Sequence, residues 1–559
     1  MRATNPMLLA DFYKISHREQ YPEKTDKVYG TWTARISRHR KANYAVAFGY
    51  QGFIKEYLID YFNENFFFKP LKDVLADYTR IIKFTLGIEP ATDHIKRLHD
   101  LGYLPIKIKA VAEGTIMPIG VPSLTIENTQ SEFFWLTNFL ETIMSNYLWV
   151  PSNSATVATI YKKILTEYAL RTVGDTDFVQ FQGHDFSMRG MSSLQSCETS
   201  GAGHLLSFVG TDTIPAICYL EKNYFANVEN ELVGTSISAS EHSVMCAGGE
   251  DNEFETYDRL ITKVYPSGFL SLVSDTWDLW KVITNTLVLL KDKIMARDGK
   301  IVIRPDTGDP VEIICGKKTL NLDIIDSDQS EAKYYVLRII NMARDENGDR
   351  VYPEYIKFRD GYFEVNVIEN ILNFLESTVS LRPVENNEIP AIKGAIECLW
   401  DIFGGTFSKN NFKVLDPHIG LIYGDAITVE RCEEICRRLY DKGFASTNVV
   451  YGIGSYTYQY QTRDSLGFAL KSTYVEIDGV GRDIFKDPVT DTGKFKKSQC
   501  GRVTVSKDEN GVINYYDSTK KAPEGREDLL KDLFVDGILL RTTTLADVRE
   551  KLNESLKSV

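Results

Sequence analysis

A repeated pattern in the middle of the chain constrains the fold more than any other feature. Short apolar runs, rich in β-branched residues, end abruptly in Gly, Ser or charged residues, and a helical pattern usually follows. Such runs predict strands over residues 178–181, 205–209, 269–273, 301–303, 419–423 and 449–451. Polar residues at the ends of successive parallel strands are typical of the active face of a (β/α) barrel, and a doubly wound open sheet places its ligands in the same way.

The last two of these strands enclose a clear amphipathic helix. Thr428 is a suitable N-cap, an apolar stripe runs from Cys432 to Leu439, and Gly443 ends the pattern. Strand, helix and strand within about thirty residues form a βαβ unit, so the two strands are expected to be parallel. Cys432 and Cys436 share a helix face, where they would form either half of a metal site or part of the core; the core interpretation is favoured.

At 559 residues the chain is too long for a single ordinary core. We expect a (β/α) barrel-like catalytic domain over 151–455 and a mixed α/β domain built from 1–150 and completed by 456–559. Residues 53–68 of that mixed domain read as aromatic-rich helix and 106–111 as an alternating strand. Within the barrel, the polar run 326–331 and the turn signal at 347–349 interrupt the strand rhythm and indicate an inserted subdomain over 311–410.

Composition narrows the class of protein. Hydrophobic residues make up 43% and charged residues 25%, as in soluble globular proteins, and the net charge of -13 argues against a general nucleic-acid or membrane binder. The first fourteen residues lack a signal-peptide pattern, and no apolar run reaches the ~18 residues of a membrane span. The 8 cysteines form no Cys-x-x-Cys pair, so we expect reduced thiols and a cytoplasmic protein.

Nine short motifs then occur in order along the chain. They are Asp11-Phe12-Tyr13-Lys14 with His17 and Gln20-Tyr21-Pro22, His184-Asp185-Phe186 with Arg189-Gly190, Gly210-Thr211-Asp212-Thr213, Ser240-Glu241-His242-Ser243, Ser274-Asp275, Arg304-Pro305-Asp306-Thr307-Gly308, Gly424-Asp425, Thr462-Arg463-Asp464 and Phe485-Lys486-Asp487-Pro488. Together they resemble the nicotinamide phosphoribosyltransferase family of NAD salvage, whose enzymes join nicotinamide to phosphoribosyl pyrophosphate. The resemblance covers nearly the whole chain except 311–410.

The resemblance implies a base pocket in which a neutral pyridine ring stacks between Phe186 and Tyr13 of a second subunit, in a homodimer. Arg189 and Ser274 would bind the carboxamide oxygen, Arg304 would also face the base, and Asp212 would accept from the carboxamide NH₂. A carboxylate at Asp212 accepts hydrogen bonds and repels the carboxylate of nicotinate, so it favours nicotinamide.

The resemblance also assigns the phosphoribosyl groups. Asp306, Gly424 and Asp425 would contact the ribose, and the loop holding Gly454 and Ser455 the 5′-phosphate, although this loop has fewer glycines than the family pattern. Since the protein is acidic overall, local cations must hold the pyrophosphate together with Mg²⁺, which is bound mainly through substrate phosphates. By resemblance these cations are Arg35, Arg463, Lys471, Lys486 and Lys494.

His242 resembles the residue that accepts a phosphoryl group from ATP in this family, with Asp278 as the carboxylate that orients it. ATP would then stimulate the reaction without donating to the product. The pyridine nitrogen carries no proton, so its attack on the anomeric carbon needs no general base. Two alternatives remain: a nicotinate-specific enzyme, which Asp212 argues against, and a catalytically silent nucleotide-binding module, which would be expected to lose His242 or the leaving-group cations.

Overall fold

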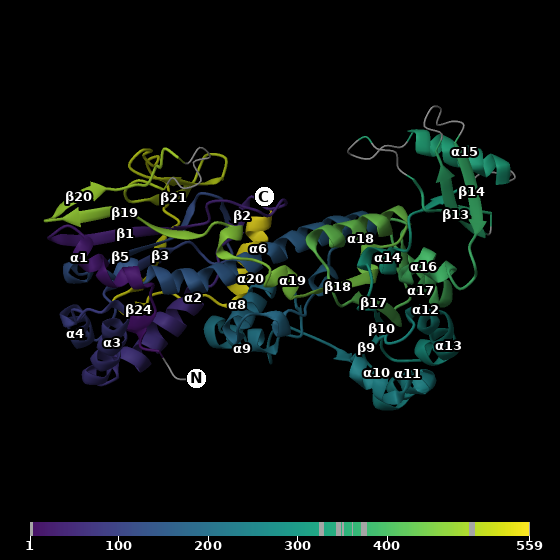
Figure 1. Cartoon of the computed structure of the whole chain (residues 1–559), viewed down its shortest axis with the longest axis horizontal. Coiled ribbons are helices and arrows are strands. Elements are labelled where there is room, and N and C mark those ends of the chain that lie inside the picture. The colour runs from purple at the N-terminus through teal and green to yellow at the C-terminus, as the bar shows by residue number, and fades with distance from the viewer. Residues whose placement is uncertain are drawn as a thin grey trace. The chain divides into compact units, whose positions relative to one another are not determined.

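The structure is a computed structural model of the chain and describes residues 4–322, 329–342, 348, 352–359, 361–369, 377–490 and 498–557. The chain forms two compact units (Figure 1). Unit 1 contains Met1–Lys162, Asp185–Thr235 and Ser455–Val559, and unit 2 contains Lys163–His184 and Ser236–Gly454. The segments 151–162 and 185–235, which the sequence pattern assigns to the barrel domain, therefore lie in unit 1.

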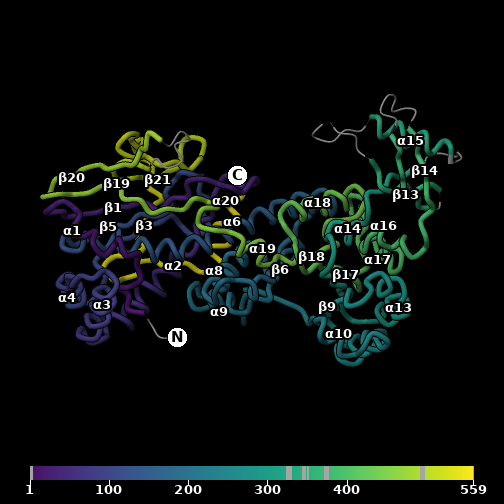
Figure 2. The backbone as a smooth tube through the Cα atoms, viewed as in Figure 1, coloured from purple at the N-terminus to yellow at the C-terminus, as the bar shows by residue number. Residues whose placement is uncertain are grey.

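Unit 1 is built on a seven-stranded antiparallel sheet to which both ends of the chain contribute. Its strand order is β20 (Val480–Asp483), β19 (Ala469–Ile477), β1 (Thr25–Thr33), β5 (Pro122–Asn128), β3 (Ile106–Ala110), β23 (Lys531–Val535) and β24 (Ile538–Leu539). Figure 2 shows the early strand β1 beside the late strand β19, which pair from Thr25↔Ile477 to Thr33↔Ala469. Side chains of β3 alternate between buried and half-buried, which confirms the strand expected from its alternating sequence.

Unit 1 also contains helices, and its core includes large buried aromatic side chains such as Trp32, Tyr50, Phe53 and Phe66. The predicted helix over 53–68 is confirmed: α2 (Tyr50–Phe53) continues through two π-helical segments, Ile54–Tyr61 and Asn63–Phe67. The other long helices are α3 (Leu71–Leu86), α4 (Asp93–Leu101), α6 (Glu141–Thr172), α8 (Leu194–His204), α9 (Ile214–Tyr224) and α20 (Leu545–Leu556). None of the helices in the described ranges is both long enough and apolar enough to cross a bilayer.

Unit 2 contains five parallel strands, which confirms the α/β class. They run in the order β18 (Val449–Ile453), β17 (Ile419–Tyr423), β10 (Ile301–Arg304), β9 (Leu270–Val273) and β8 (Ser238–Ala239). The predicted βαβ unit is β17, α18 (Val429–Asp441) and β18, and the Thr428 hydroxyl caps the helix by accepting from the Arg431 N–H at 3.2 Å. Cys432 and Cys436 are fully buried on its inner face, so the core interpretation of this pair is correct.

Two of the predicted strands are wrong. Residues 178–181 lead into the short helix α7 (Val179–Gln182), and the strand that follows is β6 (Gly183–Asp185). Residues 205–207 continue the end of α8 in turns, with the Leu205 N–H on the Gly201 carbonyl. Residues 208 and 209 have no regular secondary structure, and the strand that follows is only β7 (Gly210–Thr211). Apolar runs of four or five residues are buried in either conformation, so their period does not separate a strand from a helix end.

The predicted insertion contains a subdomain with its own hydrophobic core. A four-stranded sheet, β11 (Thr319–Asn321), β12 (Tyr355–Phe358), β13 (Gly361–Ile368) and β14 (Thr378–Pro383), carries the helix α15 (Gln329–Met342). The core between them consists of Leu322, Ala332, Val336, Ile340, Ile356, Phe358 and Val379. The helices α14 (Pro310–Cys315), α16 (Ile389–Lys393) and α17 (Ala395–Phe403) flank the subdomain in sequence. Residues 326–328, 347 and 349, on which the prediction partly depended, lie outside the described residues.

Candidate active site

In unit 2, carboxylates gather where neighbouring parallel strands end. Asp275 lies two residues beyond β9, and Asp306 lies two residues beyond β10. Asp275 Oδ2 accepts hydrogen bonds from the backbone N–H groups of Asp306 and Thr307 and from the Thr307 hydroxyl, each at 2.7 Å. These three bonds fix the loop after β10 against the end of β9 and thereby position Asp306.

Two further contacts hold this loop from the β17 side. The Tyr423 hydroxyl donates to the carbonyls of Thr307 and Gly308, at 2.9 and 3.0 Å. Gly424 lies against Asp306 so closely that a Cβ added at Gly424 would be 2.2 Å from Asp306 Oδ1. A larger residue at position 424 would therefore force the Asp306 carboxylate to move, and the Gly-Asp motif after β17 leaves room for this carboxylate.

The electrostatics of the cluster follow from burial and from crowded charges. Burial raises the pKa of Asp306; the Arg304 guanidinium, with Nε 3.8 Å from Asp306 Oδ1, lowers it, and the carboxylates of Asp275 and Asp425 raise it. Asp275 Oδ1, Asp306 Oδ1 and Arg304 Nε are buried and make no hydrogen bond within the described part of the chain. Buried polar atoms are nearly always paired, so these three atoms mark a place for a polar ligand.

His242 lies beside this cluster, at the first position of α10 (His242–Gly248). Its Nε2 is 3.8 Å from Asp306 Oδ2 and 3.9 Å from Asp275 Oδ1, and its Nδ1 is 3.3 Å from the Thr276 hydroxyl. Both carboxylates face the imidazole ring at distances beyond a direct hydrogen bond. The side chain is 45% exposed and thus open to a reagent from solvent.

Asp278, expected to orient His242, has a different contact in the structure. It is the N-cap of α12 (Leu279–Lys281), and its Oδ1 accepts from the backbone N–H groups of Trp280 and Lys281 at 2.9 and 3.1 Å. Such a cap stabilises the start of the helix. The groups that the structure places around His242 are Asp275, Asp306 and Thr276.

Ser274 and Arg304, expected at the base, also make hydrogen bonds within unit 2. The Ser274 hydroxyl donates to the Leu272 carbonyl at 2.7 Å, so this bond must break before Ser274 can donate to a carboxamide oxygen. Arg304 Nη2 donates to the Ser240 carbonyl at 2.6 Å. Asp425 is exposed, and at Gly454 an added Cβ would meet no atom within 4 Å, so the backbone there is open to a ligand.

In unit 1 the structure brings together the segments of the expected base residues. Asp212 follows β7, and its backbone N–H donates at 2.9 Å to the carbonyl of Asp185, the residue before Phe186. Arg189 lies in the turn Met188–Gly190, and a Cβ at Gly190 would lie 2.1 Å from the Ser455 hydroxyl oxygen. Asp212 and Arg189 are both exposed.

Tyr13, expected to reach the site of a second subunit, is exposed. It follows Phe12 near the start of the chain; Tyr13 is 58% exposed and Phe12 is 49% exposed. Two neighbouring aromatic rings in solvent are unusual, since rings of this size are mostly buried.

The expected pyrophosphate cations also lie in unit 1. Lys471, on β19, pairs in register with Thr31 of β1, and its Nζ is 3.5 Å from Glu141, which also pairs with Lys14. Near the end of β1, the Arg35 N–H donates to the Leu466 carbonyl and Arg35 Nε to the Gly467 carbonyl, at 3.0 and 2.9 Å. Arg35 lines a cavity of about 490 Å³.

Arg463 and Lys486 occupy other positions in that unit. Arg463 is half exposed and lies 3.3 Å from Asp464. The backbone of Lys486 pairs with Ser498, whose hydroxyl accepts from the Lys486 N–H at 3.0 Å. Lys494 lies outside the described residues.

Several residues of the cluster were not assigned a role from the sequence. Asp275 was seen only as part of a Ser-Asp motif, and Thr276, Thr307 and Tyr423 drew no attention. Asp275 follows a strand, as Asp306 does, and this position was the one sign in the sequence that it could belong to the site. Its three hydrogen bonds join it to a loop about thirty residues further along the chain, so they follow from tertiary structure and could not be predicted. Among the described residues, no group of three His, Cys, Asp or Glu side chains is arranged to hold a metal ion.

Comparison with known proteins agrees with this geometry. The chain is 43% identical over 99% of its length to a nicotinamide phosphoribosyltransferase of Acinetobacter baylyi, covering 98% of that protein. It is 32% identical to one of Mycoplasma pneumoniae, over 87% of this chain and 93% of that protein. Human nicotinic acid phosphoribosyltransferase shares the fold, with a TM-score of 0.50 and 13% identity, over 99% of this chain and 94% of that one. The family model for nicotinate phosphoribosyltransferases matches residues 181–520, and the chain belongs to this family of phosphoribosyl-transferring enzymes.

Proposed function

We propose that the enzyme transfers the 5-phosphoribosyl group of phosphoribosyl pyrophosphate to nicotinamide, giving nicotinamide mononucleotide and pyrophosphate in NAD salvage. The observation that carries this proposal is the strand-end cluster of unit 2. One buried oxygen of Asp275 and one of Asp306 make no hydrogen bond within the described ranges, and such oxygens would accept from the hydroxyl groups of a ribose. The names of the relatives at 43% and 32% identity support the same reaction.

Asp212 supports nicotinamide as the base. An exposed carboxylate after β7 accepts from the NH₂ of a carboxamide and repels the carboxylate of nicotinate. Phe186, Arg189, Ser274, Arg304 and the partner subunit's Tyr13 would complete the pocket. The exposure of Phe12 and Tyr13 agrees with a role at a homodimer interface.

The transfer needs positioning and charge more than proton transfer. The lone pair of the pyridine nitrogen forms the bond to the anomeric carbon, while the bond from this carbon to the pyrophosphate oxygen breaks and its electron pair leaves with pyrophosphate. Negative charge of Asp306 and Asp425 near the ribose stabilises the oxocarbenium-like transition state. Arg35, Arg463, Lys471, Lys486 and Lys494 would stabilise the leaving group.

Mg²⁺ belongs with the substrate in this proposal. Mg²⁺ is usually bound through substrate phosphates with one or two carboxylates, so the phosphates of phosphoribosyl pyrophosphate would carry the ion. Its charge would add to that of the lysines and arginines at the departing pyrophosphate.

His242 would couple ATP to the reaction. A nitrogen lone pair of the neutral imidazole attacks the γ-phosphorus, ADP leaves, and water later cleaves the phosphohistidine. The new phosphoryl group would face Asp275 and Asp306, since both carboxylates lie within 4 Å of the ring. This repulsion would be relieved when magnesium arrives on the substrate, so phosphorylation would favour binding of the magnesium complex.

The free thiols agree with a reducing compartment such as the cytoplasm.

One assay tests the reaction. Phosphoribosyl pyrophosphate and Mg²⁺ are offered with nicotinamide or with nicotinate, each with and without ATP, and mononucleotide is measured. We expect product from nicotinamide and a higher rate with ATP. Product from nicotinate alone would reverse the assignment of the base, and no product from either base would refute the reaction.

The substitution Asp212→Asn tests the base pocket separately. It is expected to lower the ratio of kcat/KM for nicotinamide to that for nicotinate by about tenfold, equivalent to about 1.4 kcal/mol, because the repulsion of a carboxylate disappears. An unchanged ratio would remove Asp212 from the argument.

A further inference from the structure

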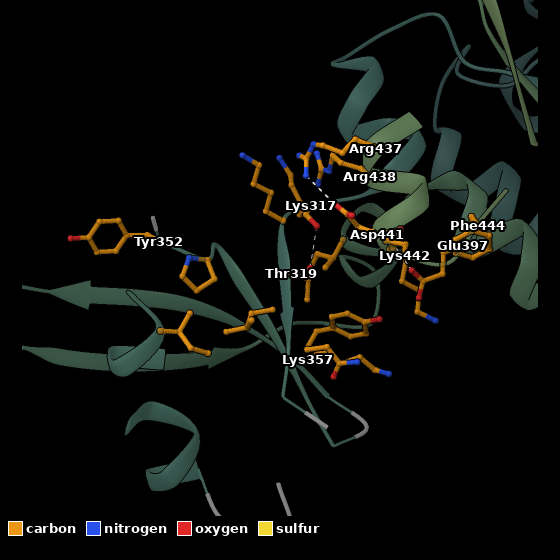
Figure 3. Close-up of a pocket in the computed structure, with 18 of the residues that line it drawn as sticks. Lys317, Thr319, Tyr352, Lys357, Glu397, Arg437, Arg438, Asp441, Lys442 and Phe444 are labelled. Atoms are coloured by element: carbon orange, nitrogen blue, oxygen red, sulfur yellow. Dashed lines mark hydrogen bonds and ion pairs between the residues drawn. The ribbon is translucent and has the colours of Figure 1, made fainter. Parts of the chain in front are cut away.

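A second cavity lies in unit 2, against the inserted subdomain, and shares no residue with the strand-end cluster. Its volume is about 640 Å³, and its walls include β11 of the subdomain and the C-terminal half of α18. Figure 3 shows Arg437 and Arg438 on α18 and Lys442 just after its end, with Lys317 and Thr319 on the segment that faces them. The size falls within the range of about 300–1,000 Å³ that is usual for small-molecule sites.

The lining of this cavity, which we call the insertion pocket, is strongly basic in an acidic protein. Eight lysine and arginine side chains line it with only two carboxylates, Glu397 and Asp441. Three carboxylates outside the lining also pair with its cations: Glu312 with Lys317, Asp401 with Lys393 and Glu434 with Arg437. Even with these included, cations outnumber carboxylates, while the whole chain has a net charge of -13.

Helix-end electrostatics accounts for only part of this excess. Cations in the last turn of a helix commonly complement its dipole, and Arg438 and Lys442 are suitably placed at the end of α18 for that role. The same explanation covers Lys393, the last residue of α16, and Lys317 and Lys318, which follow the end of α14 at Cys315. The remaining cations include Lys357 on β12 and Lys413 on β16 (Lys413–Leu415), which end no helix. Four separate segments thus direct positive charge at one cavity.

Several of these cations are held in place before any ligand binds. Arg438 Nη2 donates to the Gly316 carbonyl at 2.7 Å, and Lys442 Nζ donates to the carbonyls of Cys315 and Lys393 at 2.9 and 2.6 Å. Carbonyl partners fix a cation without cancelling its charge. A ligand would therefore meet side chains whose ordering cost is already met.

Two lysines of the lining remain without a carboxylate among the described residues. Lys413 Nζ lies 4.9 Å from the ring centre of Phe444 and 5.5 Å from that of Trp400, so its neighbours are two aromatic faces. Lys318 is exposed and forms no ion pair within the same ranges. Tyr352, at the opposite end of the residues drawn in Figure 3, adds an aromatic ring that is 40% exposed.

We propose that the insertion pocket is a second ligand site, which binds a phosphorylated small molecule of nucleotide size through its phosphates. Fixed guanidinium and ammonium groups around a concave surface match the several negative oxygens of a phosphate chain. The pocket is distinct from the catalytic cluster, so it gives the inserted subdomain a ligand-binding role of its own.

Lysine footprinting of the full-length protein tests this proposal, with inorganic tripolyphosphate as the probe. Acetylation at single-hit conditions is followed by mass spectrometry at Lys318 and Lys413, and at Lys263, an exposed lysine of unit 2 outside the lining. We expect tripolyphosphate to slow the modification of Lys318 and Lys413 but not of Lys263. Equal rates with and without the probe, or equal protection of Lys263, would overturn the proposal.

Two variants and a control sharpen the result. Arg438→Gln is expected to raise the half-protecting concentration at Lys318 and Lys413 about tenfold, since a lost charge-assisted contact is worth about 1.4 kcal/mol. Arg431→Gln removes a cation from the same helix outside the lining and should leave the concentration unchanged. If Arg438→Gln fails to fold, Lys318→Ala at the exposed position serves instead, read at Lys413. If the half-protecting concentration of tripolyphosphate is the same in the pocket variant tested as in the wild type, the proposed site is refuted.

Discussion

The contact between Gly424 and Asp306 gives the sharpest test of the catalytic cluster. In Gly424→Ala the new Cβ would lie 2.2 Å from Asp306 Oδ1, whereas a carbon and an oxygen in ordinary contact are separated by about 3.2 Å or more. The carboxylate must therefore move by about 1 Å. A displacement of this size at a reacting centre costs about 100-fold in rate, or about 2.7 kcal/mol of transition-state stabilisation.

The assay is kcat/KM for phosphoribosyl pyrophosphate, together with thermal unfolding. Gly420→Ala is the matched control, because Gly420 lies on β17, the strand that leads to Gly424, and its added Cβ would be 3.2 Å from the flexible Lys300 side chain. We expect Gly420→Ala to stay within about threefold of the wild type.

Asp306→Asn distinguishes the steric argument from the role of the carboxylate. If Asp306→Asn loses activity and Gly424→Ala does not, the steric reasoning is wrong. If neither variant loses activity, Asp306 has no part in the reaction.

Three further predictions follow from single contacts. Asp275→Asn removes a negative charge that raises the pKa of Asp306, so the acidic limb of the kcat/KM profile should move to lower pH; an unmoved limb would contradict this. Burial lowers the pKa of His94 to about 3, so as the pH falls below ~6.5 only the unfolded chain binds a proton at this histidine, and the protein loses stability. His94→Leu should reduce this loss of unfolding free energy between pH 7 and pH 5 by about 2 kcal/mol, as measured by denaturant unfolding at both pH values. Arg549 donates to the carbonyls of Leu205, Leu232 and Val233, so Arg549→Met should destabilise unit 1 by about 2 kcal/mol, and an unchanged unfolding midpoint would show that water replaces these bonds.

The sequence predicted the parallel core of unit 2 well, because its strands are buried on both faces. Ile301–Arg304 and Ile419–Tyr423 read as continuous apolar runs for that reason. The run 205–209 is equally apolar but follows the end of a helix, since burial alone sets its composition.

From the sequence, the candidate site could be predicted only for residues that directly follow a strand. Asp306 was found because it follows a strand, whereas Asp278, which the resemblance gives as the residue that orients His242, caps a helix and stays a prediction in that role. Asp275 and Asp306 come together with His242 through tertiary contacts, and no spacing in the chain encodes those distances. The four-stranded sheet of the insertion was likewise not predicted, because most side chains of its strands are half-buried or exposed and form no continuous apolar run.

The pairing of β1 with β19 has a consequence for biosynthesis. Thr31 and Lys471 are partners, although about 440 residues separate them along the chain. At about 5–20 residues per second, a ribosome needs roughly 20 to 90 s to make the second strand after the first. During that interval β1 can pair with β5 but presents an open edge, which is a template for aggregation. Nascent chains released before residue 469 should therefore depend on chaperones far more than the finished protein does.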